Sequence, residues 1–165
     1  MQRRTLVLMP AALALAACGF QLRQQPELAF RTMYAGFKPT SPLGAELRRA
    51  LASSGNTRLI DNPRELSQAQ VIMDVLTDQR EKVVVGVGAV GQVREFQLRV
   101  RFRFRLRTPQ GRELIDETEL LLQRDLSFNE TAVLAREQEE DLLYRDMQSD
   151  IVQQVLRRLA AVRLG

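Results

Sequence analysis

The clearest pattern in the chain is a strict alternation of apolar and arginine side chains between Glu95 and Arg107. The even positions from Phe96 to Leu106 are apolar, and every odd position from Arg99 to Arg107 is arginine. This two-residue period predicts a β-strand with one buried and one solvated face, because a helix would spread the same arginines around its surface. Five guanidinium groups would then stand in one row, about 7 Å apart. Neighbouring like charges repel, so the row needs nearby carboxylates or an anionic ligand.

A return strand is expected to supply some of these carboxylates. Residues 108–112 suit a three-residue hairpin loop with Gly111 in the left-handed position. In that register the numbers of paired residues sum to 220. Three arginines then face glutamates: Arg101 faces Glu119, Arg103 faces Glu117 and Arg107 faces Glu113. Arg105 would face Ile115 and Arg99 would face Leu121, which leaves two arginines without a carboxylate directly across. The row is therefore either an exposed salt-bridge ladder or an anion-binding or partner-docking face.

The remaining elements follow from shorter patterns. Ser41 and Pro42 are typical of a helix N-cap and first position, and they predict a helix over 42–53 that ends before Gly55. The other expected elements are a first strand from Leu28 to Tyr34, a brief extended piece at 57–60, a turn at 61–63, a long strand at 69–85 with a bulge near 79–82, and a final helix at 131–162 capped by Asn129. The chain thus runs strand, helix, long strand, hairpin, long helix.

A glycine motif lies between the long strand and the arginine strand. Residues 86–91 match G-x-G-x-x-G, the pattern of a dinucleotide-binding loop. Such a site requires the loop to open a helix whose N-terminus holds the pyrophosphate. Here the loop leads into another strand, so the motif predicts an exposed, flexible hairpin tip rather than a nucleotide site.

Composition excludes several kinds of chemistry. The chain has no histidine and one cysteine. Histidine-based general-base catalysis, Ser-His-Asp and Cys-His nucleophiles, and His/Cys metal sites are therefore ruled out. Carboxylates such as Glu117 and Glu119 lie beside arginines that should keep their pKa values low, which is unsuitable for a general acid. We expect a non-enzymatic protein with no catalytic residue, no metal site and no cofactor.

The N-terminus predicts export and lipidation. Residues 1–17 have a short basic start and an apolar, alanine-rich run that is too short for a permanent membrane span. The run ends Leu-Ala-Ala-Cys-Gly, which resembles a bacterial lipobox in which Cys18 is acylated and the signal is removed before it. The alternative is an ordinary secretory signal followed by a chance cysteine. We expect a signal peptide at 1–17, a lipidated tether at 18–27 and a single domain at 28–165.

Export also changes the interpretation of the charge. The formal net charge of +4 suggests a nucleic-acid binder on composition alone. Loss of Arg3 and Arg4 with the signal lowers this charge by two, and nucleic acid is not available outside the cytoplasm. The anions that remain are lipid headgroups, lipopolysaccharide and acidic proteins. By similarity to other bacterial lipoproteins, Gly19 after the cysteine favours sorting to the outer membrane, with the domain on the periplasmic side.

Several short motifs give the chain a family resemblance. They are Cys18-Gly19-Phe20-Gln21-Leu22-Arg23, Gly91-Gln92 leading into Glu95-Phe96, residues 132–137 (Ala-Val-Leu-Ala-Arg-Glu), Asp146-Met147, and Gln154 with Arg158-Leu159. In this order and spacing they resemble the lipopolysaccharide-assembly lipoprotein LptE family. The resemblance covers most of the chain that follows the signal.

The resemblance implies a fold and a role. The implied fold is α+β, a two-layer sandwich with two helices on one face of a four-stranded mixed sheet. The implied partner is the outer-membrane β-barrel LptD, in whose lumen the lipoprotein lodges, aiding barrel assembly and, in some members, contacting lipopolysaccharide. A polar barrel interior would suit the charged sheet face. The alternative is a different outer-membrane lipoprotein adaptor that docks an acidic envelope protein through its arginine-rich face.

Three arginines are the candidate lipopolysaccharide or anion contacts. Arg99 and Arg105 are the row members without a carboxylate directly across, and guanidinium groups bind phosphate well. Arg136 lies at the start of the last helix, where the family is similar in having a basic residue linked to lipopolysaccharide contact. At the hairpin tip the family can carry a basic residue before Gly91, but Ala89 and Val90 stand here instead, which argues against a tip contact of that kind.

Overall fold

The computed structural model describes residues 27–53, 55, 57–127 and 133–164. The expected signal peptide, Cys18, nearly all of the tether and the expected cap Asn129 lie outside these residues. In chain order the elements are β1 (Thr32–Ala35), α2 (Pro42–Ser53), β2 (Arg58–Ile60), the 3-10 helix η1 (Pro63–Gln68), β3 (Val71–Val87), β4 (Val93–Arg107), β5 (Glu113–Ser127) and α3 (Val133–Ala161). Helix α2 has the predicted bounds, and the Ser41 hydroxyl caps it by accepting a hydrogen bond from the Gly44 amide at 2.8 Å.

The strands form one mixed sheet in the order β2-β1-β3-β4-β5. Strand β1 runs parallel to both β2 and β3, and β3, β4 and β5 form an antiparallel meander. The expected α+β class is confirmed, but the expected four strands and the element order built on them are wrong, because residues 58–60 pair with β1 as a fifth strand between α2 and β3. The turn expected at 61–63 instead leads into η1, which begins at Pro63 and is capped by Asn62.

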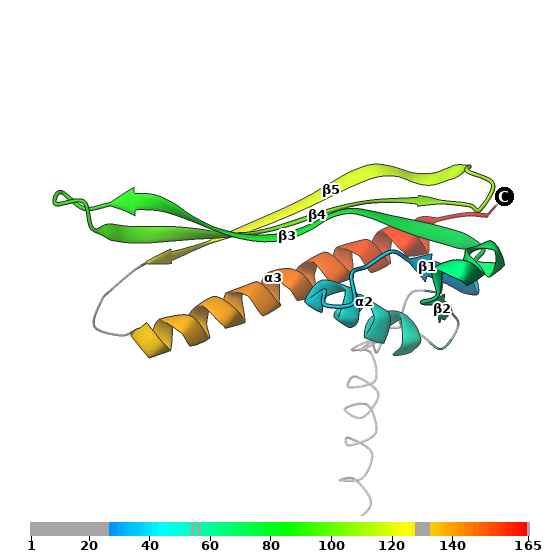
Figure 1. The fold of residues 1–165 in the computed structure, drawn as a ribbon, viewed down its shortest axis with the longest axis horizontal. Helices are drawn as coiled ribbons and strands as arrows, with labels where there is room; N and C mark the ends of the chain where they lie inside the picture. Colours follow the sequence, from blue (N-terminus) through cyan, green and yellow to red (C-terminus); the bar gives the residue numbers. More distant parts are fainter. Residues whose placement is uncertain (1–26, 54, 56, 128–132, 165) are drawn as a thin grey trace, which may run out of the picture.

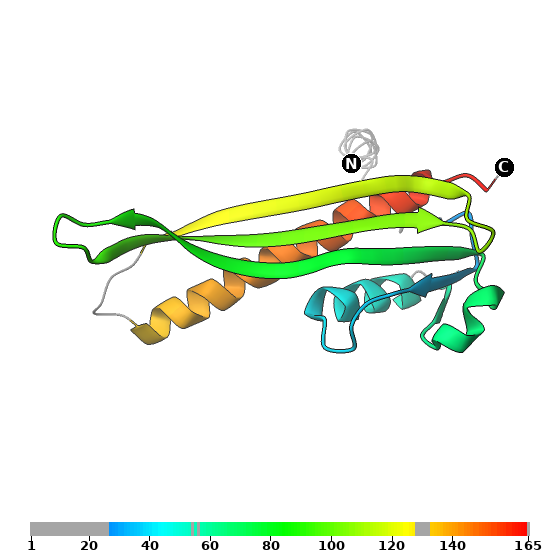
Figure 2. The same cartoon turned by 45° about the horizontal axis from the view of Figure 1, so that its top comes forward.

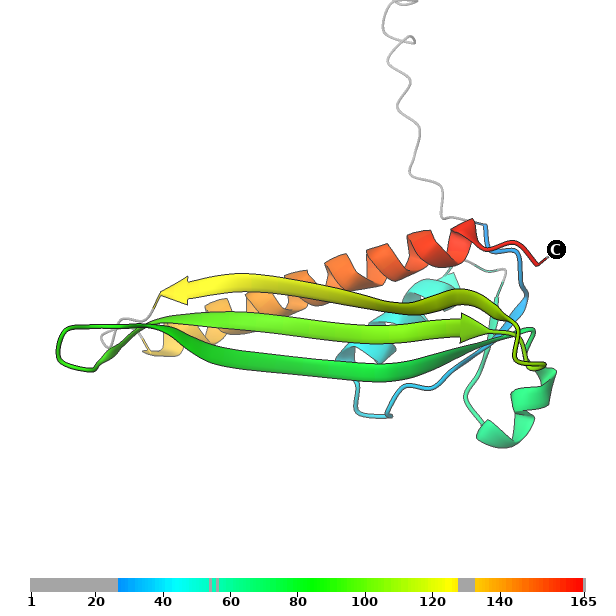
Figure 3. The same cartoon turned by 90° about the horizontal axis from the view of Figure 1, so that it is seen from above.

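Both helices cover the same face of the sheet, and the other face of the three long strands is uncovered (Figures 1 and 3). The even positions of β4 point into the helical layer, and Leu98 through Leu106 are buried as the alternation predicts. They pack against one stripe of α3 and one of α2: Met147, Ile151, Val155, Leu159, Leu43, Leu47 and Leu51. The tip of the β3–β4 hairpin projects beyond β5 and α3 (Figures 1 and 2).

An aromatic stack and a glycine join α2 to the sheet. The Phe102 ring stacks on Phe37 and Phe104, with centroid distances of 5.6 and 5.3 Å. Gly44 of α2 lies so close to Phe37 that a Cβ at this position would be 2.6 Å from the ring. The helix therefore packs closely on the aromatic residues at the base of the sheet.

Irregularities in the strands differ from the expected register. Strand β3 bulges at Leu76 and again between Val84 and Val87, so the bulge expected at 79–82 is wrong. Between β4 and β5 the sum of paired residue numbers rises from 220 at Arg107 to 222 at Phe104. Since this shift totals two residues, the odd positions of both strands still share the outer face.

Candidate functional site

The uncovered face of the sheet carries the arginine row. We call this surface the arginine face, and it comprises Asp74 and Glu81 of β3, Arg99, Arg101, Arg103, Arg105 and Arg107 of β4, and Glu113, Glu117 and Glu119 of β5. The antiparallel meander places these side chains in three parallel rows, with the arginines in the middle row. The arrangement follows directly from the two-residue period of β4.

Asp74 binds both arginines at the end of the row nearest the 108–112 loop. Its Oδ2 accepts hydrogen bonds from Arg105 Nε at 2.9 Å and Arg107 Nε at 2.8 Å, and its Oδ1 accepts one from Arg107 Nη2 at 3.3 Å. Partial burial raises the pKa of the Asp74 carboxyl, but the hydrogen bonds from Arg107 and Arg105 outweigh this and hold the pKa below its usual range. The bond to Asp74 raises the pKa of Arg107.

This cluster corrects the expectation that Arg105 has no carboxylate. Arg105 also lies 3.8 Å from Glu113, whereas Arg107, the expected partner of Glu113, bonds to Asp74 instead. The hairpin register predicts partners only from the return strand, whereas Asp74 belongs to β3. The bulge at Leu76 reverses the parity of β3, so that Asp74 faces outward while Asp78 and Arg80, which share its parity, face the helices.

The middle of the row is paired diagonally. In the register, Arg103 stands opposite Glu119 and Arg101 opposite Leu121, so the expected direct pairings are wrong. The expected ion pairs nevertheless form across the diagonal: Arg103 Nη2 lies 2.7 Å from Glu117 and Arg101 Nη1 lies 3.5 Å from Glu119. The buried Nε atoms of both arginines have no hydrogen-bond partner among the residues that the structure describes.

Arg99 is the least neutralised member of the row. Its register partners are Glu81 on β3 and Gln123 on β5, and its Nε donates to Gln97 Oε1 at 2.8 Å. Within the described residues it is the one arginine of the five without an ion pair. The expected partner Leu121 is wrong, and Glu81 of β3 stands directly across from Arg99, although the two form no ion pair in this part of the chain.

Arg136 does not join the arginine face. It lies near the start of α3, in the helical layer on the opposite side of the sheet, and its Nη1 is 3.9 Å from Glu139 of the next turn. The structure thus separates the three candidate residues into Arg105 in the Asp74 cluster, Arg99 further along β4 and Arg136 on the other layer. The lipidation candidate Cys18 lies outside the described residues.

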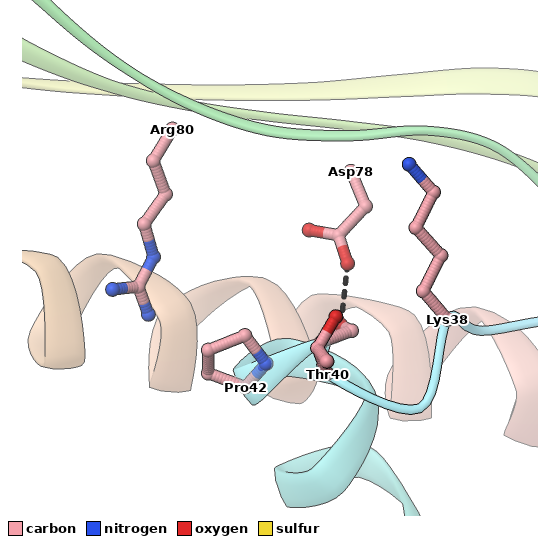
Figure 4. Close-up of a pocket in the computed structure, with 6 residues that line it drawn as sticks. Lys38, Thr40, Pro42, Asp78 and Arg80 are labelled. Atoms are coloured by element: carbon pink, nitrogen blue, oxygen red, sulfur yellow. Dashed lines mark hydrogen bonds between the residues drawn. The ribbon is translucent and has the colours of Figure 1, made fainter.

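A small pocket that the sequence analysis missed lies between β3 and the start of α2. Its volume is about 200 Å³, and it is lined by Lys38, Thr40, Ser41, Pro42, Asp78 and Arg80. Figure 4 shows Asp78 reaching from the strand toward the start of α2, and Arg80 extending beside it toward the helical layer. Ser41 donates a short hydrogen bond to Asp78, and Arg80 donates one to Gln148 of α3. These residues mainly connect the sheet to the helices. Of the six, the sequence singled out Ser41 and Pro42, and only as the start of a helix.

A polar row fixes α3 against β3. Lys82 Nζ lies 2.6 Å from Glu140, and the Tyr144 hydroxyl donates to the Glu81 carbonyl at 2.8 Å. Burial and the nearby Glu140 raise the pKa of Tyr144. These contacts cover part of the edge of β3 that has no neighbouring strand. Across the described ranges, no group of three or more acidic, histidine or cysteine side chains is placed to hold a metal ion, and no helix has the length and apolar content to cross a membrane.

A family model and a curated relative both point to one family, and solved lipoprotein structures share the fold. A family model described as "LptE: Lipopolysaccharide-assembly" matches residues 30–159. The LPS-assembly lipoprotein LptE of Pectobacterium atrosepticum is 27% identical over 161 residues, which cover 96% of this chain and 85% of that protein. The solution structure of an uncharacterized lipoprotein B from Nitrosomonas europaea is 33% identical, with a TM-score of 0.72 over 87% of this chain and 91% of that one. A minor lipoprotein from Acinetobacter baumannii, 19% identical, shares the fold with a TM-score of 0.63 over 84% of this chain and all of that one.

Proposed function

The chain belongs to the LptE lipopolysaccharide-assembly family, and we propose that it is a non-enzymatic outer-membrane lipoprotein that plugs an LptD-like β-barrel. In this role it is anchored by acyl chains on Cys18 and supports assembly of the barrel and export of lipopolysaccharide. Its domain sits on the periplasmic side and enters the barrel lumen from there. No cofactor or nucleic acid takes part.

The observation that carries the proposal is the character of the arginine face. It is uncovered and rich in hydrogen-bonding groups, yet most of its arginines are neutralised by carboxylates of the same surface. A polar barrel lumen offers alternating donors and acceptors rather than one strong charge. A nearly balanced face therefore fits such a wall, since neither surface must bury an unpaired charge.

The same balance weakens the alternative of an adaptor for an acidic envelope protein. That function depends on a strongly positive row that attracts acidic groups at long range. With Asp74, Glu117 and Glu119 paired into the row, little net positive charge remains to attract them. Crosslinking from an arginine-face position would identify the neighbour and separate the two functions.

Direct contact with lipopolysaccharide is a narrower part of the proposal. Arg99 has no ion pair in the described residues, so its guanidinium has donors left for a phosphate oxygen. Among the described residues, the ion pair of Arg136 is a 3.9 Å contact with Glu139. Arg105 is a weaker candidate than the sequence suggested, because Asp74 and Glu113 already surround it.

Co-purification tests the barrel partnership. We expect the lipidated chain, extracted in mild detergent, to bring an outer-membrane barrel with it. The double variant Arg101→Glu with Arg103→Glu should reduce barrel recovery about tenfold or more, because it places repulsive charges on the docking face.

The matched control is Arg145→Glu with Arg157→Glu, which reverses two exposed charges on α3. This control should leave recovery unchanged, and circular dichroism should show that both variants are folded. Recovery of the wild type only as a free monomer, or equal losses in both double variants, would refute docking through the arginine face.

A further inference from the structure

The sheet has a long open edge at β5. This strand is the last in the sheet, and among the described residues no strand pairs with its outer side. From Thr118 to Ser127 it pairs with β4 without a shift in register, and the whole strand contains neither proline nor glycine. A regular edge of this kind accepts a further strand unless bulges, prolines or inward-pointing charges prevent it.

The other long edge, on β3, has such protection. Strand β1 pairs with residues 71–73, and beyond them β3 bulges at Leu76 and again between Val84 and Val87. Three charged residues between these bulges point inward and are tied to the start of α2 or to α3: Asp78 to Ser41, Arg80 to Gln148 and Lys82 to Glu140. The β3 edge is therefore closed to an added strand, and the β5 edge is not.

The odd-numbered residues of β5 direct their backbone groups to the open edge. Next to the hairpin loop the Thr108 amide bonds to the Arg112 carbonyl, so even-numbered residues of β4 and β5 bond to each other, and the two-residue shift keeps this parity. The Gln123 carbonyl accordingly accepts a hydrogen bond from its neighbour's side chain, Arg124 Nη1, at 2.9 Å. Residues 119, 121, 123 and 125 thus present backbone groups at the spacing that an added strand requires.

Helix α3 extends beneath the position that an added strand would take. Seen from above, the C-terminal part of α3 lies beyond the edge of β5 (Figure 3), and Figure 2 shows the same offset. Arg124 of β5 reaches Asp150 on this side of the helix, with 3.6 Å between Nη2 and Oδ2. Because the helical layer continues past the last strand, a further strand would have a surface on which to pack.

The side chains of β5 indicate the chemistry of that strand. On the arginine face an acidic row on β3 and another on β5 flank the basic row of β4. The β5 row is only partly neutralised: Glu119 lies 3.5 Å from Arg101, and Asp125 accepts a hydrogen bond from Gln97 but forms no ion pair among the described residues. Opposite charges on neighbouring strands attract, so basic side chains suit the next row. Toward α3, Leu120 and Leu122 favour apolar neighbours.

We propose that residues 118–127 form a strand-addition site for an extended segment of the β-barrel partner, in which basic side chains on the arginine-face side alternate with apolar ones toward α3. This inference rests on the proposed function, which supplies the partner. Main-chain hydrogen bonds to the odd-numbered residues hold the segment, and its side chains provide selectivity. The site lies beside the arginine face, so that face stays available for the barrel wall.

Amide hydrogen exchange tests the site in the full lipidated chain, alone and in complex with the barrel that co-purifies with it. In the free chain the amides of residues 119, 121, 123 and 125 should exchange quickly, whereas those of the even-numbered residues between them are protected by β4. In the complex we expect exchange at these odd positions to slow about tenfold or more. Fragmentation mass spectrometry resolves the alternate residues.

Proline at position 123 gives a second test with a matched control. Gln123→Pro removes the side chain and the amide that faces the open edge, whereas Gln123→Ala removes the side chain alone. Edge strands accept proline where its nitrogen faces solvent, and circular dichroism should confirm that both variants are folded. We expect Gln123→Pro to lower barrel recovery about tenfold and Gln123→Ala to leave it unchanged. Asp125→Lys should also lower recovery, because it repels a basic strand.

The outcomes separate this inference from the proposed function. If the barrel co-purifies with the wild type but the odd amides stay unprotected, the strand-addition site is refuted while the proposed function stands. Recovery of no barrel at all would refute both. Protection in the free chain that grows with protein concentration would assign the edge to a second copy, and higher recovery with Asp125→Lys would require an acidic strand. Either result overturns the partner that we infer.

Discussion

At its base the β3–β4 hairpin lies between β1 and β5 and most of its charges are paired, whereas its tip, residues 87–93, carries no charged side chain and projects beyond β5 (Figure 1). The base buries Met73, Phe102 and Phe104 completely. The tip leaves Val87 and Val90 open to solvent. One pair of strands therefore supplies both the most enclosed and the most exposed apolar residues of the described sheet.

The base and the tip of the hairpin therefore differ in what their apolar residues do: those of the base stabilise the fold, and those of the tip are exposed to other molecules. Burial of apolar area stabilises the base, and ion pairs on its outer side add to it without covering that side. At the tip, exposed valines contribute little to folding because they remain in water in the isolated chain. The base thus holds the arginine face in place, while the exposed apolar side chains of the tip are available for an external contact.

Phe102→Ala should have the largest effect, because it removes a fully buried ring from the base. The ring stacks on Phe37 and Phe104 and connects α2 to the sheet. We expect the free energy of unfolding to fall by about 3–5 kcal/mol, measured by urea denaturation. A loss below about 1 kcal/mol would show that the base is not the main source of stability.

Asp74→Asn should have an intermediate effect, and the effect should depend on pH. The substitution leaves Arg105 and Arg107 without their shared carboxylate, and we expect a loss of about 1–3 kcal/mol at neutral pH. The pKa of Asp74 is lowered in the folded protein, so its stabilisation is present above the unfolded pKa of about 3.9. It is lost as pH falls from about 4 through the lowered pKa, and wild type and variant should converge there.

Glu113→Gln is the matched control for this prediction. Glu113 lies at the same end of the row, but it is half exposed and its closest arginine contact is 3.8 Å. Its removal should cost less than about 0.5 kcal/mol at any pH in denaturant titrations. If Asp74→Asn behaved like Glu113→Gln, the paired charges would not distinguish the base from the tip.

The sequence predicted the elements of this comparison better than their pairing. Strong local signals, such as the period of β4 and the Ser41-Pro42 cap, gave a correct strand and a helix with the correct bounds. The 108–112 loop was also correct, with Gly111 at φ +93° and a bond from Thr108 to Arg112. These features depend on residues close in sequence, where the physical cause is local.

The errors arose where pairing is not local. A single extra residue at Leu76 turns Asp78 to the inner face, whereas Asp74, which precedes the bulge, faces outward. Strand β2 exists because β1 offers it a parallel edge, although only three residues take part. Arg105 consequently acquired a partner from β3 that could not be predicted from the hairpin register alone.

The smallest effect on folding is expected at the tip, from Val87→Asp combined with Val90→Asp. Both side chains are mostly solvent-exposed, and the turn bonds are made by backbone groups that neither substitution removes. The free energy of unfolding should therefore stay within about 0.5 kcal/mol of the wild type in urea titrations without lipid. A loss of several kcal/mol without lipid would instead mean that the valines support the fold, and the contrast between a stabilising base and a contacting tip would fail.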